Sequence, residues 1–195
     1  MFYFKVILVT VVLSVILALD IYRIKKGNKV CIYIDLDGVL FSPVINPFVV
    51  RTEPWNVDFY MLSLVRKLRE TTRYKICFLC SAFDEHSVCE IRDVLRKTGV
   101  GDISKIFVPY GYNKADFINN EAAILIDDST YELFHWQKRP GLVGIKYYNG
   151  FNGTHGNWAR LNGLSISRDM SIDDAFNFIV NRAGELQNIV NSYTM

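Results

Sequence analysis

Short apolar runs alternate with segments of helical periodicity along the chain, and this alternation constrains the fold more than any other feature of the sequence. Strands that alternate with helices form a parallel sheet that is covered on both faces. We therefore predict an α/β fold of three layers around a central parallel sheet. The apolar runs predict strands at 30–34, 75–80, 105–109, 122–126 and 142–148, and the helical spacing predicts helices at 57–71, 84–97, 131–137 and from 171 onward, where Ser171 and Asp174 are typical of a capping box.

Polar side chains stand where the predicted strands end, and these positions indicate a site. The carboxyl ends of parallel strands meet at one edge of a sheet, where ligands bind. Four carboxylates at one edge require a hard cation, and oxygen ligands favour Mg²⁺. A serine hydroxyl and a lysine ammonium are suited to a phosphoryl group. The residues that follow the first four strands in this way are Asp35 and Asp37, Ser81, Lys114, and Asp127 with Asp128.

Each of these residues also has a purely structural interpretation. A single aspartate at a strand end is usually a turn former or a helix cap, and Asp127 or Asp128 could cap the helix at 131–137. Ser81 could likewise cap the helix that follows it. Lys114 could be a solvated surface residue, as most lysines are. The presence of all the motifs in order, each near a strand end, favours a site.

The same stretches resemble the motifs of a known superfamily. "DLDGV" (35–39), the serine that closes "FLCS" (78–81), the lysine in "NKADF" (113–117) and "LIDDS" (125–129) resemble the four motifs of the haloacid dehalogenase-like phosphohydrolases. The flanking text, including "ILIDDSTYELFHW" (124–136), resembles the 5'(3')-deoxyribonucleotidase family and its bacterial and phage relatives. The resemblance covers roughly residues 30–160. It implies a Rossmann-like sandwich and a magnesium-dependent phosphomonoesterase that acts on nucleoside monophosphates.

The resemblance also implies a role for the residues of the first motif. Asp35 is similar to the family's nucleophile, whose carboxylate attacks phosphorus and forms an aspartyl-phosphate. Asp37 would protonate the leaving oxygen and later deprotonate the attacking water. Gly38 would permit the sharp turn that brings the main-chain carbonyl of Asp37 to the metal.

The remaining motifs would hold the phosphate and the metal. Ser81 and Lys114 would bind the phosphate oxygens and offset charge in the transition state. The resemblance makes Asp128 the aspartate that binds Mg²⁺ directly, together with Asp35 and Asp37. Asp127 would then support these ligands from behind.

Between the first motif and the first helix, the chain departs from the nucleotidase family. Family members carry a helical cap there, whereas only residues 41–55 are available here, so we predict a minimal cap. The cap supplies much of the base recognition, and without it we expect poor selectivity among bases. Phe41, Phe48 and Trp55 could still stack on a base, and Arg51 could lie near a phosphate. The alternative is ordinary packing of a short loop.

Residues 1–28 form a segment separate from the domain, and we predict that this segment is a hydrophobic helix. "VILVTVVLSVILAL" (6–19) is free of charge, and the apolar character extends to about 20 residues, enough for a membrane span. Basic residues at 23–29 follow it, so the positive-inside rule places the domain at 29–195 in the cytoplasm, behind a single-pass anchor. The alternatives are a cleaved signal peptide with export, and a buried core helix.

Charge and cysteine content exclude some other functions. Five of the 22 basic residues and one of the 20 acidic residues lie in 1–29, which leaves 17 basic and 19 acidic residues in 30–195 and no footprint for a nucleic-acid polymer. Cys77 and Cys80 are three apart in one predicted strand and point to opposite faces, so we expect Cys31, Cys77, Cys80 and Cys89 to be small buried thiols.

The sequence is also compatible with two other functions. One is a phosphatase for another small or membrane-associated phosphate ester, and the other is a catalytically retired, membrane-tethered binding module. The intact motif residues argue against the second. The glycine-rich segment 149–158 could close over a substrate, with Asn149, Thr154 or His155 near the phosphate, or it could be a structural turn.

Overall fold

The structure is a computed structural model that describes residues 30–42, 56–82, 84–150, 158 and 163–192. Six strands in these residues form one all-parallel sheet, in the order β3-β2-β1-β4-β5-β6. The predicted α/β class and parallel sheet are confirmed, and the strand order is Rossmann-like. The strands are β1 (Val30–Ile34), β2 (Lys75–Ala82), β3 (Ser104–Pro109), β4 (Ala122–Asp127), β5 (Leu142–Tyr148) and β6 (Ser165–Ser167).

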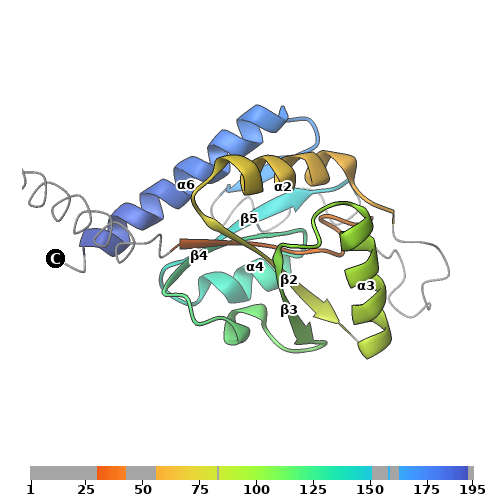
Figure 1. Ribbon diagram of the computed structural model, residues 1–195. Helices are drawn as coiled ribbons and strands as arrows, with labels where there is room; N and C mark the ends of the chain where they lie inside the picture. The colour runs from red at the N-terminus through yellow and green to blue at the C-terminus, as the bar shows by residue number, and fades with distance from the viewer. Residues whose placement is uncertain (1–29, 43–55, 83, 151–157, 159–162, 193–195) are drawn as a thin grey trace, which may run out of the picture.

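In the described part of the chain, four α-helices and one 3-10 helix cover the two faces of this sheet (Figure 1). Helices α2 and α6 lie side by side over one face, and α4 lies over the other. The bounds of the predicted elements that fall in the described residues agree with the structure to within two residues, whereas β6 and η1 were not predicted. The helices are α2 (Phe59–Thr71), α3 (Glu85–Lys97), η1 (Lys114–Phe117), α4 (Thr130–Gln137) and α6 (Ile172–Ser192).

The core is divided by the sheet into two clusters, because side chains alternate along a strand. In β1, Ile32 and Ile34 face the larger cluster, which contains the buried residues of α2, α3 and α6. Cys31 and Tyr33 face the smaller cluster, which contains residues of η1 and α4. Both faces of the central strands are therefore buried, which explains why these strands read as continuous apolar runs.

The start of α3 decides between two interpretations of Ser81. Asp84 is the N-cap of α3, and its side chain accepts a hydrogen bond from the Ser87 N–H at 2.8 Å. Ser81 lies at the end of β2, so its interpretation as a helix cap is wrong. Ser171 is confirmed as the cap of α6, because its Oγ accepts from the Asp174 N–H at 3.0 Å; its hydroxyl also donates to Asp174 Oδ2 at 2.7 Å.

The four cysteines are all free thiols, as expected, but they are not all buried. Cys77 and Cys80 lie in different core clusters, which confirms that they face opposite sides of β2. Cys89 is exposed, and the expectation of burial was wrong for this residue. It lies on the side of α3 away from the buried Ile91 and Leu95.

Several predictions concern residues outside the described ranges. Among the residues that the structure describes, no helix is both long enough and apolar enough to span a membrane. The hydrophobic segment at 1–28 lies outside them, so its membrane anchoring stays a prediction. Phe48, Arg51 and Trp55 are likewise outside. The described residues that flank their segment, Ser42 and Asn56, lie next to each other, because the Ser42 N–H donates to the Asn56 carbonyl at 2.8 Å.

Asp58 joins the start of α2 to β5 and to the turn after β6. Its Oδ1 caps α2 by accepting from the Tyr60 and Met61 N–H groups at 3.0 and 3.2 Å. Its Oδ2 accepts from the Tyr147 hydroxyl at 2.6 Å and from Arg168 Nη2 at 2.8 Å. Because Asp58 is buried, these partners hold α2, β5 and the turn after β6 together.

We expect Asp58→Ala to lower the free energy of unfolding by about 2–4 kcal/mol, because it removes a helix cap and the hydrogen bonds from Tyr147 and Arg168 to a buried carboxylate. Urea denaturation measures this loss. The matched control is Asp93→Ala, which breaks an exposed ion pair with Arg96 and should cost less than about 1 kcal/mol. Equal losses in the two variants would contradict a structural role for Asp58.

Candidate active site

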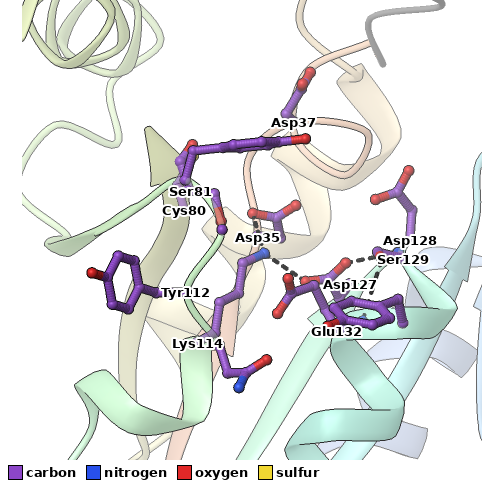
Figure 2. Close-up of a pocket in the computed structure, with 14 residues that line it drawn as sticks. Asp35, Asp37, Cys80, Ser81, Tyr112, Lys114, Asp127, Asp128, Ser129 and Glu132 are labelled. Atoms are coloured by element: carbon purple, nitrogen blue, oxygen red, sulfur yellow. Dashed lines mark hydrogen bonds and ion pairs between the residues drawn. The ribbon is translucent and has the colours of Figure 1, made fainter. Parts of the chain in front are cut away.

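The candidate site lies where the strand order reverses, between the carboxyl ends of β1 and β4. Open α/β sheets bind ligands at such switch points. A cavity of about 430 Å³ is found there, and Figure 2 shows the side chains around it. All six motif residues named from the sequence line this cavity. Its lining is Asp35, Asp37, Cys80, Ser81, Tyr110, Gly111, Tyr112, Asn113, Lys114, Asp127, Asp128, Ser129, Tyr131 and Glu132.

Strand periodicity explains why these side chains converge. Residues two apart in a strand share a face, so Asp35 follows Tyr33 onto the face that η1 and α4 cover. Ser81 in β2 and Asp127 in β4 are placed on this face by the same rule. Lys114 is the first residue of η1 on that face. The carboxylates, the hydroxyl and the ammonium therefore meet on one side of the sheet.

Lys114 joins two of the carboxylates. Its Nζ lies 2.8 Å from Asp35 Oδ1 and donates to Asp127 Oδ2 at 2.6 Å. Its side chain is 4% exposed, so the interpretation as a solvated surface lysine is wrong. Burial alone would lower the pKa of Lys114, but Asp127 and Asp35 outweigh it, and the pKa is raised. The two carboxylates therefore favour the charged form of Lys114 at the floor of the cavity.

Asp127 and Asp128 have different surroundings. Asp127 Oδ2 accepts from Lys114, and Asp127 Oδ1 accepts from the Ser129 N–H at 2.7 Å. The N-cap of α4 is Ser129, so the interpretation of either aspartate as that cap is wrong. Asp128 Oδ2 accepts from Asn149 Nδ2 at 2.9 Å. Both oxygens of Asp127 are thus held by the protein, which suits a supporting role.

Gly38 is required for more than the turn predicted at this position. Its φ of +82° lies in the left-handed region that glycine adopts at no steric cost. A Cβ at this position would lie 2.1 Å from Asp128 Oδ2, so no other residue leaves space for that carboxylate. The Gly38 carbonyl also accepts from Asn149 Nδ2 at 2.8 Å. Asn149 therefore links the turn after β1 to Asp128.

Three buried carboxylates form the acidic centre of the site. Ligand oxygens of Asp35, Asp127 and Asp128 lie within 4.8 Å of one another. Burial raises the pKa of Asp35 well above its ordinary value; Lys114 opposes this rise, while Asp127 and Asp128 add to it. With Lys114, the three carboxylates carry a formal charge of −2. An all-oxygen donor set of this charge fits a divalent cation such as Mg²⁺.

Asp37 and Phe41 are placed differently from the other candidates. Asp37 lines the cavity but is not part of the acidic centre, and Figure 2 shows its carboxylate directed away from Asp35. The like charges that act on Asp35 come from β4 instead. Phe41 is 1% exposed and packs in the larger core cluster, beside Val57, so the suggestion that it stacks on a base was wrong. Its packing alternative is confirmed.

Sequence reasoning missed other residues beside the site. Lys146 is buried in β5, in register with Asp127, and donates to Thr130 Oγ1 at 2.6 Å. Burial lowers its pKa, although Asp128 and Asp127 raise it. Lys146 was not predicted because it lies within a strand, whereas the candidates were sought among the residues that follow strands. The tyrosines at 110 and 112 follow β3 directly and could have been found by that search.

Comparisons with known proteins leave the function to be inferred from this geometry, because no family model matches the chain and no curated protein matches it. The site offers a buried carboxylate at a strand end, a cation in contact with it, a nearby hydroxyl and an acidic centre. Such a set can hold a phosphate ester and attack its phosphorus.

Proposed function

We propose that the chain is a Mg²⁺-dependent phosphomonoesterase of the haloacid dehalogenase-like type that works through an aspartyl-phosphate. The observation that carries this proposal is the pair of Asp35 and Lys114, 2.8 Å apart, at the floor of a cavity at the switch point of the sheet. A nucleophilic carboxylate and a fixed cation are the two groups that phosphoryl transfer to a protein side chain requires.

The proposed reaction has two steps at phosphorus. The Asp35 carboxylate forms a bond to phosphorus, and the bond from phosphorus to the ester oxygen breaks. Asp37, in its protonated form, gives its proton to the departing alkoxide. In the second step Asp37 takes a proton from water, which attacks phosphorus and releases inorganic phosphate from Asp35. The partly exposed position of Asp37 at the cavity supports an exchange of protons with solvent.

The other side chains bind and orient the phosphate. Lys114 and Ser81 would hold its oxygens, and Asp127 holds Lys114 in place through the 2.6 Å contact. Asp35, Asp128 and the main-chain carbonyl of Asp37 would hold Mg²⁺. When bound, Mg²⁺ would supply positive charge that offsets the phosphoryl oxygens and the acidic centre.

Small phosphate esters are the proposed substrates, with nucleoside monophosphates first. A volume of about 430 Å³ falls in the range of small-molecule sites. The test is release of inorganic phosphate by the purified full chain from a panel of nucleoside monophosphates and sugar phosphates, with Mg²⁺ or with EDTA. We expect phosphate release in the presence of Mg²⁺ and none in the presence of EDTA. No release from any ester in the presence of Mg²⁺ would overturn the proposal.

We also propose that residues 1–28 anchor the domain to the cytoplasmic side of a membrane, as the basic residues after the apolar run indicate. Cells that express the full chain should hold it in the membrane fraction, and protease added to intact cells should leave the domain uncut. A soluble full-length chain, or a domain digested from outside, would refute this topology.

A further inference from the structure

Exposed aromatic side chains gather around the mouth of the cavity. In the described part of the chain, seven large hydrophobic side chains are exposed, and five of them lie in two short segments, 110–117 and 131–134. The first segment runs from the end of β3 through η1, and the second belongs to α4. Chance placement would spread these side chains over the surface, so the clustering calls for an explanation at this site.

Three of these side chains line the cavity itself. Tyr110, Tyr112 and Tyr131 are 61%, 61% and 64% exposed. The ring of Tyr112 packs edge-to-face on Phe117, with centroids 6.0 Å apart, and the ring of Tyr131 lies 4.4 Å from the ring of His135. The rings of Tyr112 and Tyr131 are thus each packed against another ring of the protein. A planar group could stack on these rings without ordering flexible side chains.

The charges of the lining restrict what accompanies that planar group. Among the described residues that line the cavity, five side chains are carboxylates and Lys114 is the one basic side chain. The cavity therefore favours a single phosphate and disfavours further anionic groups on the ligand.

We propose that the substrates are phosphomonoesters whose organic part has no negative charge and carries a planar aromatic ring, and that Tyr112 and Tyr131, with Tyr110, bind this ring. The inference rests on the proposed phosphatase function. Aromatic recognition was expected from the 41–55 segment. It is assigned instead to the β3–η1 connection and to α4.

Matched pairs of esters test this recognition. Thymidine 5'-monophosphate and methyl 2-deoxyriboside 5-phosphate share the sugar and the leaving oxygen, and differ in the base. Benzyl phosphate and cyclohexylmethyl phosphate are a second pair with primary leaving groups of similar size. We expect kcat/KM of the full chain to be about tenfold higher for the aromatic member of each pair, as stacking of one ring on an aromatic side chain predicts.

Substitutions assign this preference to the tyrosines. In Tyr112→Ala/Tyr131→Ala the ratio within each pair should fall toward one, because the loss falls on the aromatic member. Tyr112→Phe keeps the ring and should keep most of the ratio. Phe59→Ala is the matched control, because Phe59 is a 78% exposed aromatic residue of α2 outside the cavity lining.

Two outcomes would overturn the inference: a wild-type ratio near one, or a ratio that the double tyrosine variant leaves unchanged. Failure of the proposed function looks different, since none of the four esters would then be hydrolysed. In that case calorimetric binding of the thymidine pair to the full chain measures the ring preference directly, and equal affinities for the two compounds would overturn the inference too.

Discussion

Asp35→Asn should reduce phosphate release by at least about three orders of magnitude, the scale seen when a nucleophile is removed from an active site. Asparagine has the shape of aspartate and can accept a hydrogen bond from Lys114, so the cavity keeps its form. It cannot carry out the attack on phosphorus that forms the covalent intermediate. Phosphate release by the full chain with Mg²⁺ measures the effect.

The same substitution should leave the protein as stable as before, or more stable, in the absence of Mg²⁺. Burial, Asp127 and Asp128 raise the pKa of Asp35 despite Lys114. A carboxyl whose pKa is higher in the folded state costs stability as the pH rises above its unfolded pKa, and asparagine removes this cost. Lost activity without lost stability is the pattern of a residue kept for chemistry rather than for folding.

A nearby aspartate provides the control. Asp116 is exposed on η1, two residues from Lys114, so Asp116→Asn makes the same chemical change outside the cavity and should leave turnover unchanged. If Asp35→Asn released phosphate at a near-normal rate, the assignment of the nucleophile would be contradicted. If both variants lost activity, the effect would come from charge in general rather than from attack by Asp35.

Local patterns were sufficient for the sheet and the floor of the site. The central strands β1 and β4 are buried on both faces, so each appears in the sequence as an apolar run whose end is marked by a polar residue, Asp35 and Asp127 respectively. Because parallel strands share a direction, residues distant in sequence could be expected at one edge. That step needed no knowledge of which strands are neighbours.

Features that depend on tertiary contact were not accessible in this way. Strand β6 has only three residues, too few for a periodic pattern. Phe41 resembles a loop aromatic in the sequence, but it pairs with Val57 and packs in the larger core cluster. Lys146 sits inside a strand, where its partner Thr130 comes from another element. In each case the decisive neighbour is distant in the chain.

Lys114→Met should lower the free energy of unfolding by about 3–5 kcal/mol near neutral pH without Mg²⁺, because it leaves buried carboxylates without their cation. Methionine keeps most of the volume, so lost packing contributes little. The side chains of Lys114, Asp35 and Asp127 are 4%, 7% and 0% exposed, and water cannot replace the lost charge. Urea denaturation measures the loss, which should shrink at low pH as the carboxyls take up protons.

The control for this loss is Lys67→Met, which breaks an ion pair whose Asp173 partner is 74% exposed and should cost less than about 1 kcal/mol.

The second test is the double variant Lys114→Met/Asp35→Asn. If the penalty comes from unpaired charge, removing one carboxylate must restore part of the stability, so the two substitutions are not additive. Mg²⁺ should also restore part of it, since a divalent cation supplies the missing charge. Additive losses, with no recovery on adding Mg²⁺, would show that Lys114 contributes packing rather than charge, and would remove the electrostatic basis of the site.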